Sequence, residues 1–115
     1  MEILETSLGT VPVLRVTGEI DHDTSPVFAE AARKVLRPDS FQLLLDLSDC
    51  DYFDSGGLAV ILSIVRDFRA RGWLGVIGAS ANILRLFEII GLTAEPCLRF
   101  FPTRDKAKAH AAELR

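Results

Sequence analysis

The chain has 115 residues, of which 49% are hydrophobic and 25% charged, and its formal net charge is −3. This composition is typical of a globular protein, and residues 1–115 are predicted to form a single domain. The sequence pI of about 5.3 argues against direct binding of nucleic acid, because proteins that bind nucleic acid usually have a basic surface patch. Apolar runs fall short of the roughly 20 residues of a membrane span, and the acidic N-terminus is unlike a signal peptide. We therefore expect a cytoplasmic protein without membrane contacts.

The first third of the chain predicts a β-hairpin followed by a helix. Residues 3–7 and 11–17 are typical of two strands, with Gly9-Thr10 as the turn, and residues 18–23 form a polar connection. A helix is predicted to start at Thr24 or Ser25, just before Pro26, and to run to about Arg37. Its buried face is marked by apolar residues at helical spacing: Phe28, Ala31, Ala32, Val35 and Leu36.

The middle of the chain predicts a buried strand, an acidic turn and a second helix. Residues 38–40 end the first helix, and the apolar run 41–47 is typical of a central strand buried on both faces. Residues 48–54 are expected to form the turn, and the helix runs from Ser55 to about Arg71, with Gly72 in the left-handed position. Its expected buried stripe is Leu58, Ile61, Leu62, Val65 and Phe68.

Two apolar residues of this second helix lie outside its expected stripe. At 100° per residue Val60 projects roughly opposite Leu62, and Ile64 falls on the flank of the stripe. Single exposed apolar residues are common on proteins, so this surface has two interpretations. It is either ordinary surface or a partner-binding surface next to Ser55.

The last third of the chain predicts strand, helix, strand and helix. Residues 73–78 are typical of a short buried strand, and Ser80 is the expected cap of a third helix that ends at Gly91-Leu92. Residues 97–101 form the last expected strand, and an alanine-rich helix follows. The order β-β-α-β-α-β-α-β-α predicts an α/β fold with a mixed sheet, in which an antiparallel N-terminal hairpin is followed by parallel strands.

Ser55 stands at the start of the second helix, where a hydroxyl suits two roles. Serine is a preferred N-cap, because its oxygen accepts a hydrogen bond from a backbone N–H one turn on. The same position suits a phosphate, because free N–H groups and the positive end of the helix dipole favour an anion. Both interpretations stay open on the local sequence.

The sequence gives little support for an active site of its own. His22 and His110 are not placed in a recognisable nucleophile pattern, and residues 54–57 lack the flanks of a GxSxG elbow and the lysine of a phosphate-binding loop. Cys50 and Cys97 have no zinc-ligand spacing. No cofactor is expected. A hard-cation site remains as a minor alternative, made from the four carboxylates Asp46, Asp49, Asp51 and Asp54.

Four stretches together resemble the STAS domain family, and within it the anti-sigma factor antagonists. They are VTGEID at residues 16–21, LLDLS at 44–48, YFDSGGL at 52–58 and IIGL at 89–92. The resemblance covers nearly the whole chain. It implies that the unphosphorylated protein binds a serine-kinase anti-sigma factor and frees a sigma factor. It further implies that the kinase phosphorylates Ser55 and that a PP2C-type phosphatase resets it. Gly56 departs from the many relatives that have serine or threonine there, which leaves kinase recognition open.

A phosphate on Ser55 is expected to act on the contact surface with little refolding, because it enlarges a negative patch where the partner sits. The two glycines after Ser55 either keep side chains away from a kinase or serve a tight turn, and both readings are open. The expected partner-binding residues are Asp21, Asp23, Asp54, Gly56, Gly57, Val60 and Ile64.

Two alternative functions remain for the same chain. The domain could be an accessory subunit of a transporter or lipid-trafficking complex, with Ser55 only a helix cap at an interface. A metal-dependent enzyme acting at the aspartates is the third candidate. We expect a monomer or a weak homodimer.

Overall fold

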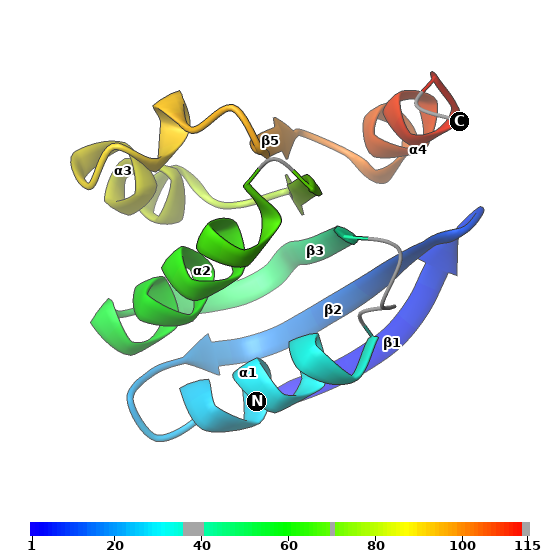
Figure 1. The fold of residues 1–115 in the computed structure, drawn as a ribbon. Coiled ribbons are helices and arrows are strands. Elements are labelled where there is room, and N and C mark those ends of the chain that lie inside the picture. The colour runs from blue at the N-terminus through cyan, green and yellow to red at the C-terminus, as the bar shows by residue number, and fades with distance from the viewer. Residues whose placement is uncertain (36–40, 70, 114–115) are drawn as a thin grey trace.

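The computed structural model describes residues 1–35, 41–69 and 71–113 (Figure 1). The elements follow the predicted order, with one short 3-10 helix added after the third helix. They are β1 (Glu2–Leu8), β2 (Val11–Ile20), α1 (Ser25–Val35), β3 (Phe41–Phe53), α2 (Ser55–Phe68), β4 (Gly72–Ile77), α3 (Ala81–Ile89), η1 (Leu92–Ala94), β5 (Leu98–Phe101) and α4 (Arg104–Glu113).

The strands form one five-stranded sheet in the order β1-β2-β3-β4-β5. β1 and β2 are antiparallel, and the other three pairings are parallel, which confirms the mixed sheet predicted from the sequence. Because β2 and β3 are parallel neighbours, their carboxyl ends lie at the same edge of the sheet, with Ile20 opposite Phe53. The loop after β2 and the start of α2 therefore lie next to each other.

Alternating side chains of β3 divide the core into two clusters on opposite faces of the sheet. Leu43, Leu45 and Leu47 belong to the larger cluster, which receives the buried side chains of α1, α2 and α3. Leu44 belongs to the smaller cluster, which includes Ala107 of α4. Helices α1, α2 and α3 therefore cover one face and α4 the other, and α1 and α2 run alongside each other in Figure 1.

Both strands that lead to the start of α2 are longer than predicted. β2 continues through Gly18, whose φ is +100°, to Ile20, so the first half of the expected polar connection is strand. β3 continues to Phe53, so the expected acidic turn at residues 48–54 is wrong for all but Asp54. Buried Cys50 and Phe53 hold the extension in the sheet although most of their neighbours are polar.

Among the predicted helix boundaries, the C-terminal end of α2 was wrong. α2 ends at Phe68, and Gly72 is the first residue of β4 rather than a left-handed helix end. Ser80 caps α3 by accepting a hydrogen bond from the Ile83 N–H, and Gly91 is left-handed with φ of +81°, both as predicted. The expected end of α1 at residues 36–37 and the break at 38–40 lie outside the described residues. Within the described part of the chain, no helix is both long and apolar enough to cross a bilayer.

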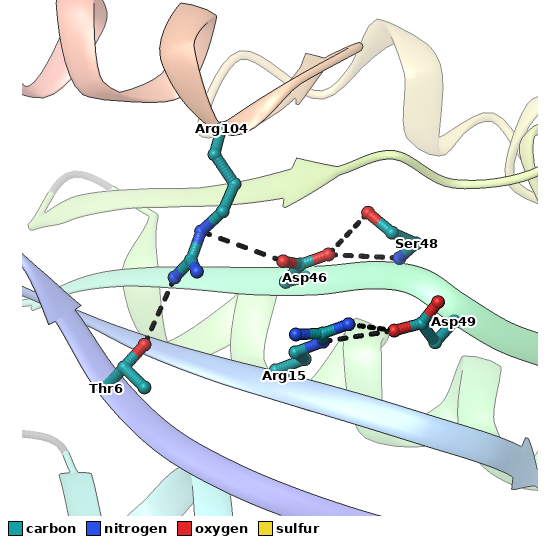
Figure 2. Close-up of polar contacts among 6 residues, drawn as sticks. All are labelled: Thr6, Arg15, Asp46, Ser48, Asp49 and Arg104. Atoms are coloured by element: carbon teal, nitrogen blue, oxygen red, sulfur yellow. Dashed lines mark hydrogen bonds and ion pairs between the residues drawn. The ribbon is translucent and has the colours of Figure 1, made fainter.

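A buried carboxylate connects β3 to α4 on the second face of the sheet (Figure 2). Asp46 is 3% exposed, and one of its oxygens accepts hydrogen bonds from the Ser48 backbone N–H at 3.0 Å and hydroxyl at 2.6 Å. The other oxygen lies 3.8 Å from Nε of Arg104, whose Nη2 also donates to the hydroxyl of Thr6 at 3.1 Å. Arg104, the first residue of α4, thereby links that helix to β3 and β1.

Replacing Asp46 should destabilise the fold more than replacing the neighbouring Asp49. Asp46→Ala removes the acceptor of two Ser48 donors and the buried partner of Arg104, which should lower the free energy of unfolding by about 1–3 kcal/mol. Asp49 pairs with Arg15, but both side chains are more than two-fifths exposed, so Asp49→Ala should cost less than about 1 kcal/mol. Urea unfolding of the two variants measures the difference, and equal losses would contradict this assignment.

Candidate functional site

Asp54, not Ser55, is the N-cap of α2. Asp54 has an extended backbone, with φ of −113° and ψ of −169°, and its Oδ1 accepts hydrogen bonds from the N–H groups of Gly56 at 2.8 Å and Gly57 at 3.3 Å. Ser55 is the first helical residue. The interpretation of Ser55 as a cap is therefore wrong, because the neighbouring aspartate, an equally good cap, takes that position.

Ser55 has an exposed and unengaged hydroxyl. Its side chain lies on the surface at the first residue of α2. The hydroxyl makes no hydrogen bond with any residue that the structure describes, and the nearby N–H groups of Gly56 and Gly57 donate to Asp54. A group on another molecule could reach this oxygen without first breaking a contact inside the protein.

The loop between β2 and α1 is tied to the start of α2 by Asp54. Oδ2 of Asp54 accepts a hydrogen bond from the backbone N–H of His22 at 3.0 Å. The backbone N–H of Asp54 also donates to the carbonyl of Ile20 at 3.1 Å. These contacts bring the predicted residues Asp21 and Asp23 to the same edge of the sheet as Ser55. His22 was not among the predicted site residues, although the parallel pairing of the two strands implies its position.

Asp21 uses its carboxylate inside the loop. Its Oδ1 accepts from the backbone N–H groups of Asp23 and Thr24, both at 2.9 Å, and its carbonyl accepts from the Ser25 N–H at 2.8 Å. Hydrogen bonds from the Thr24 backbone, then from the Thr24 hydroxyl and the Asp23 backbone, hold the pKa of Asp21 below its ordinary value against the effect of desolvation. Because folding lowers this pKa, the ionised Asp21 carboxylate stabilises the folded protein at pH values above the ordinary aspartate pKa. This contribution is lost as the pH falls through the lowered pKa of the folded state. Asp23 is exposed.

The two glycines after Ser55 lie in close packing, which is tighter at Gly57 than at Gly56. A Cβ on Gly57 would lie 2.8 Å from side-chain carbons of both Ile20 and Phe53. A Cβ on Gly56 would lie 3.1 Å from the Asp54 Oδ1 and from the Cα of His22. Neither glycine has a positive φ, so the tight-turn reading of these residues is wrong. Small residues are needed here because the helix start lies against β2, β3 and the loop.

The apolar residues predicted on the free side of α2 lie along a groove between α1 and α2. Val60 is half-buried, whereas Ile64 is only 7% exposed, so the expectation of exposed apolar surface at Ile64 is wrong. Leu62, expected in the core, is 40% exposed. The buried face of α2 includes Ile64 and not Leu62, because α2 packs on α1 as well as on the sheet. The groove has a volume of about 490 Å³ and is lined in part by His22, Ala29, Gly56, Val60 and Ile64.

The four aspartates of the minor cation alternative lie in different environments. Asp46 is buried beneath α4, Asp49 pairs with Arg15, Asp51 is exposed, and Asp54 caps α2. Across residues 1–35, 41–69 and 71–113, no three His, Cys, Asp or Glu side chains are grouped so that they could hold a metal ion.

Comparison with known proteins assigns the chain to a family. A family model described as "Mlab, STAS domain" matches residues 3–99. The chain belongs to the STAS domain family. It is 35% identical over 94 residues to the anti-sigma-B factor antagonist of Listeria monocytogenes, a match that covers 81% of this chain and 82% of that protein. This finding confirms the resemblance identified in the sequence.

Solved structures of STAS domains share the fold. An anti-sigma factor antagonist from Mycobacterium paratuberculosis superimposes with a TM-score of 0.80 at 26% identity, covering 96% of this chain and 92% of that chain. A sulfate transporter family protein from Wolinella succinogenes superimposes with a TM-score of 0.74 at 18% identity, covering 91% and 87%. The second likeness shows the fold alone.

Alanine at Gly57 should destabilise the protein, whereas alanine at Gly56 should not. In Gly57→Ala the new methyl group would displace Ile20 or Phe53, at a cost of about 1–3 kcal/mol in the free energy of unfolding. In Gly56→Ala the contacts begin at 3.1 Å, and the better helix propensity of alanine offsets them by up to about 1 kcal/mol. Urea unfolding compares the two, and an equal or greater loss at Gly56 would refute the packing argument.

Proposed function

We propose that this STAS domain is an anti-sigma factor antagonist that phosphorylation of Ser55 switches off. The observation that carries the proposal is the exposed, unengaged Ser55 hydroxyl at the start of α2, in a chain 35% identical to an anti-sigma-B factor antagonist. The unphosphorylated protein binds a serine-kinase anti-sigma factor and so frees a sigma factor. A PP2C-type phosphatase restores this form.

The kinase supplies the catalytic groups for phosphorylation, and this protein supplies the acceptor serine. The Ser55 oxygen attacks the γ-phosphorus of a nucleoside triphosphate on the kinase, and the bond from that phosphorus to the bridging oxygen breaks. The nucleoside diphosphate leaves, and the hydroxyl proton passes to a base of the kinase. Ser55 supplies the acceptor oxygen, and Asp54 holds the first turn of α2 that presents it.

The phosphate changes the charge of the partner-binding surface. It adds about −1.5 to −2 charges at pH 7, beside the carboxylates of Asp54 and exposed Asp23. Two unit charges about 5 Å apart repel by roughly 1–3 kcal/mol at an effective dielectric of about 20–80. A repulsion of that size against an acidic group of the partner weakens binding about tenfold to a hundredfold.

The proposed interface combines three parts that lie together in the structure. They are the loop after β2 with Asp21 and Asp23, the start of α2 with Gly56 and Gly57, and the groove at Val60 and Ile64. Asp21 and Gly57 support this surface from within, because the carboxylate of Asp21 is bonded to its own loop and Gly57 is buried. Asp23, Ser55 and Val60 are the parts that a partner could touch.

The runner-up function is that of an accessory subunit of a transporter or lipid-trafficking complex. The description of the matching family model, "Mlab, STAS domain", is the observation that favours it. In that case Ser55 is only an exposed residue of the first turn, and binding does not depend on its modification. Identification of the partner by co-purification separates the two functions.

Substitution of Ser55 tests the proposal directly. With the candidate anti-sigma kinase, Ser55→Ala should retain binding and incorporate no phosphate, because it loses only the acceptor oxygen. Ser55→Asp should bind about tenfold or more weakly, because it brings a charge to the same place. Calorimetry measures the affinity, and mass spectrometry measures the phosphate.

The matched control for this experiment is Ser7→Ala, which removes an exposed hydroxyl of β1 outside the proposed interface. The Ser7→Ala variant should be phosphorylated as efficiently as the wild type. Phosphate on the Ser55→Ala variant at the wild-type level would reject the site.

A further inference from the structure

Two N–H groups that could receive a phosphate at the start of α2, those of Gly56 and Gly57, are already in use. A phosphate on a first-turn serine normally finds free backbone donors and the positive end of the helix dipole. In this protein the N–H groups of Gly56 and Gly57 donate to Oδ1 of Asp54, at 2.8 and 3.3 Å. A phosphoryl group could use these donors only if the Asp54 carboxylate moved away.

Asp54 is held from several sides. Its Oδ2 accepts from the His22 N–H at 3.0 Å, its N–H donates to the Ile20 carbonyl at 3.1 Å, and its carbonyl accepts from the Leu58 N–H at 3.0 Å. Moving the carboxylate would break its hydrogen bonds to both glycines and to His22 together. Each bond to a charged acceptor is among the stronger ones in proteins, so the bound carboxylate resists replacement.

The neighbouring charges also disfavour an inward phosphate. Asp21 and Asp23 lie on the loop that Asp54 holds, and the Asp21 carboxylate already accepts its hydrogen bonds from that loop. The side chain of His22 is exposed on the same loop. A phosphate bound at the helix N-terminus would therefore lie close to the Asp54 carboxylate, which is held in place by its hydrogen bonds.

We propose that Asp54 is a positioning residue that keeps a phosphoryl group on Ser55 off the helix N-terminus, directed outward and accessible to a phosphatase. The inference rests on the proposed function, because it concerns the same phosphoserine. In the reset step a water oxygen attacks the phosphorus, and the bond from phosphorus to the Ser55 oxygen breaks. That oxygen takes a proton, and inorganic phosphate leaves. Attack on an outward phosphate requires no prior release from the helix.

The test uses full-length protein with phosphoserine installed at position 55 during synthesis, so no cognate kinase is needed. Nuclear magnetic resonance follows the backbone amide signals of Gly56, Gly57 and His22, with and without the phosphate. In the wild type we expect these three signals to keep their unphosphorylated positions apart from small shifts. Large downfield shifts at Gly56 and Gly57, together with loss of the His22 hydrogen bond, would show that the phosphate replaces Asp54 and would overturn the proposal.

Two substitutions of Asp54 separate its hydrogen bonds from its charge. Asp54→Ala frees the Gly56 and Gly57 donors, and Asp54→Asn keeps an oxygen acceptor for them without the charge. Alkaline phosphatase serves as the probe of accessibility. We expect the Ala variant to lose its phosphate at least about tenfold more slowly than the wild type, the factor that one charge-assisted hydrogen bond to the phosphate would give.

The Asn variant should be dephosphorylated within a few-fold of the wild-type rate, since its cap is intact. Equal rates in the Ala, Asn and wild-type proteins would overturn the positioning role, and so would a slow Asn variant. Should the Ala variant not fold, the amide signals of the wild type and the Asn variant still decide the question. Failure to find a kinase that modifies Ser55 would reject the proposed function and leave these measurements unaffected.

Discussion

The carboxylate of Asp54 is the contact on which the geometry of the candidate site depends. It bonds the first turn of α2 through Gly56 and Gly57 and the loop after β2 through His22. The parallel pairing of β2 with β3 brings these two segments to one edge of the sheet, and Asp54 then fixes their relative position. A single side chain thus defines a surface assembled from parts that are about 30 residues apart in the sequence.

The order of the elements and the mixed sheet could be predicted from the sequence because they follow from strong periodic patterns. The apolar run of residues 41–47 and the helical stripe of Phe28, Ala32 and Val35 have the spacing of the elements they form. The extension of β3 to Phe53 could not be predicted in the same way. Its residues are mostly polar, and two buried side chains at Cys50 and Phe53 hold it in the sheet through tertiary contacts.

The details of the site were harder to predict than the fold. Asp54 and Ser55 are both preferred N-caps, and only the backbone conformation shows that the helix begins one residue after Asp54. The burial of Ile64 depends on the packing of α1 against α2, which helical spacing within α2 alone cannot reveal. The proximity of Asp21 to Ser55 was predictable, because it follows from the parallel strands that precede both residues.

The proposed partner-binding surface lies on the face of the sheet that also contains the larger core cluster, and the Asp46–Arg104 contact lies on the opposite face. On the α4 face, the buried Asp46 and the partly exposed Arg104 join β3, α4 and β1 (Figure 2). On the other face, α2 is seated by Gly57 against Ile20 and Phe53, so its start has no room to shift inward. A phosphate added at this helix start, as proposed, would act outward, on a partner bound there. A rigid domain can therefore serve as a switch when the change of charge lies on its surface and the core that supports that surface stays as it was.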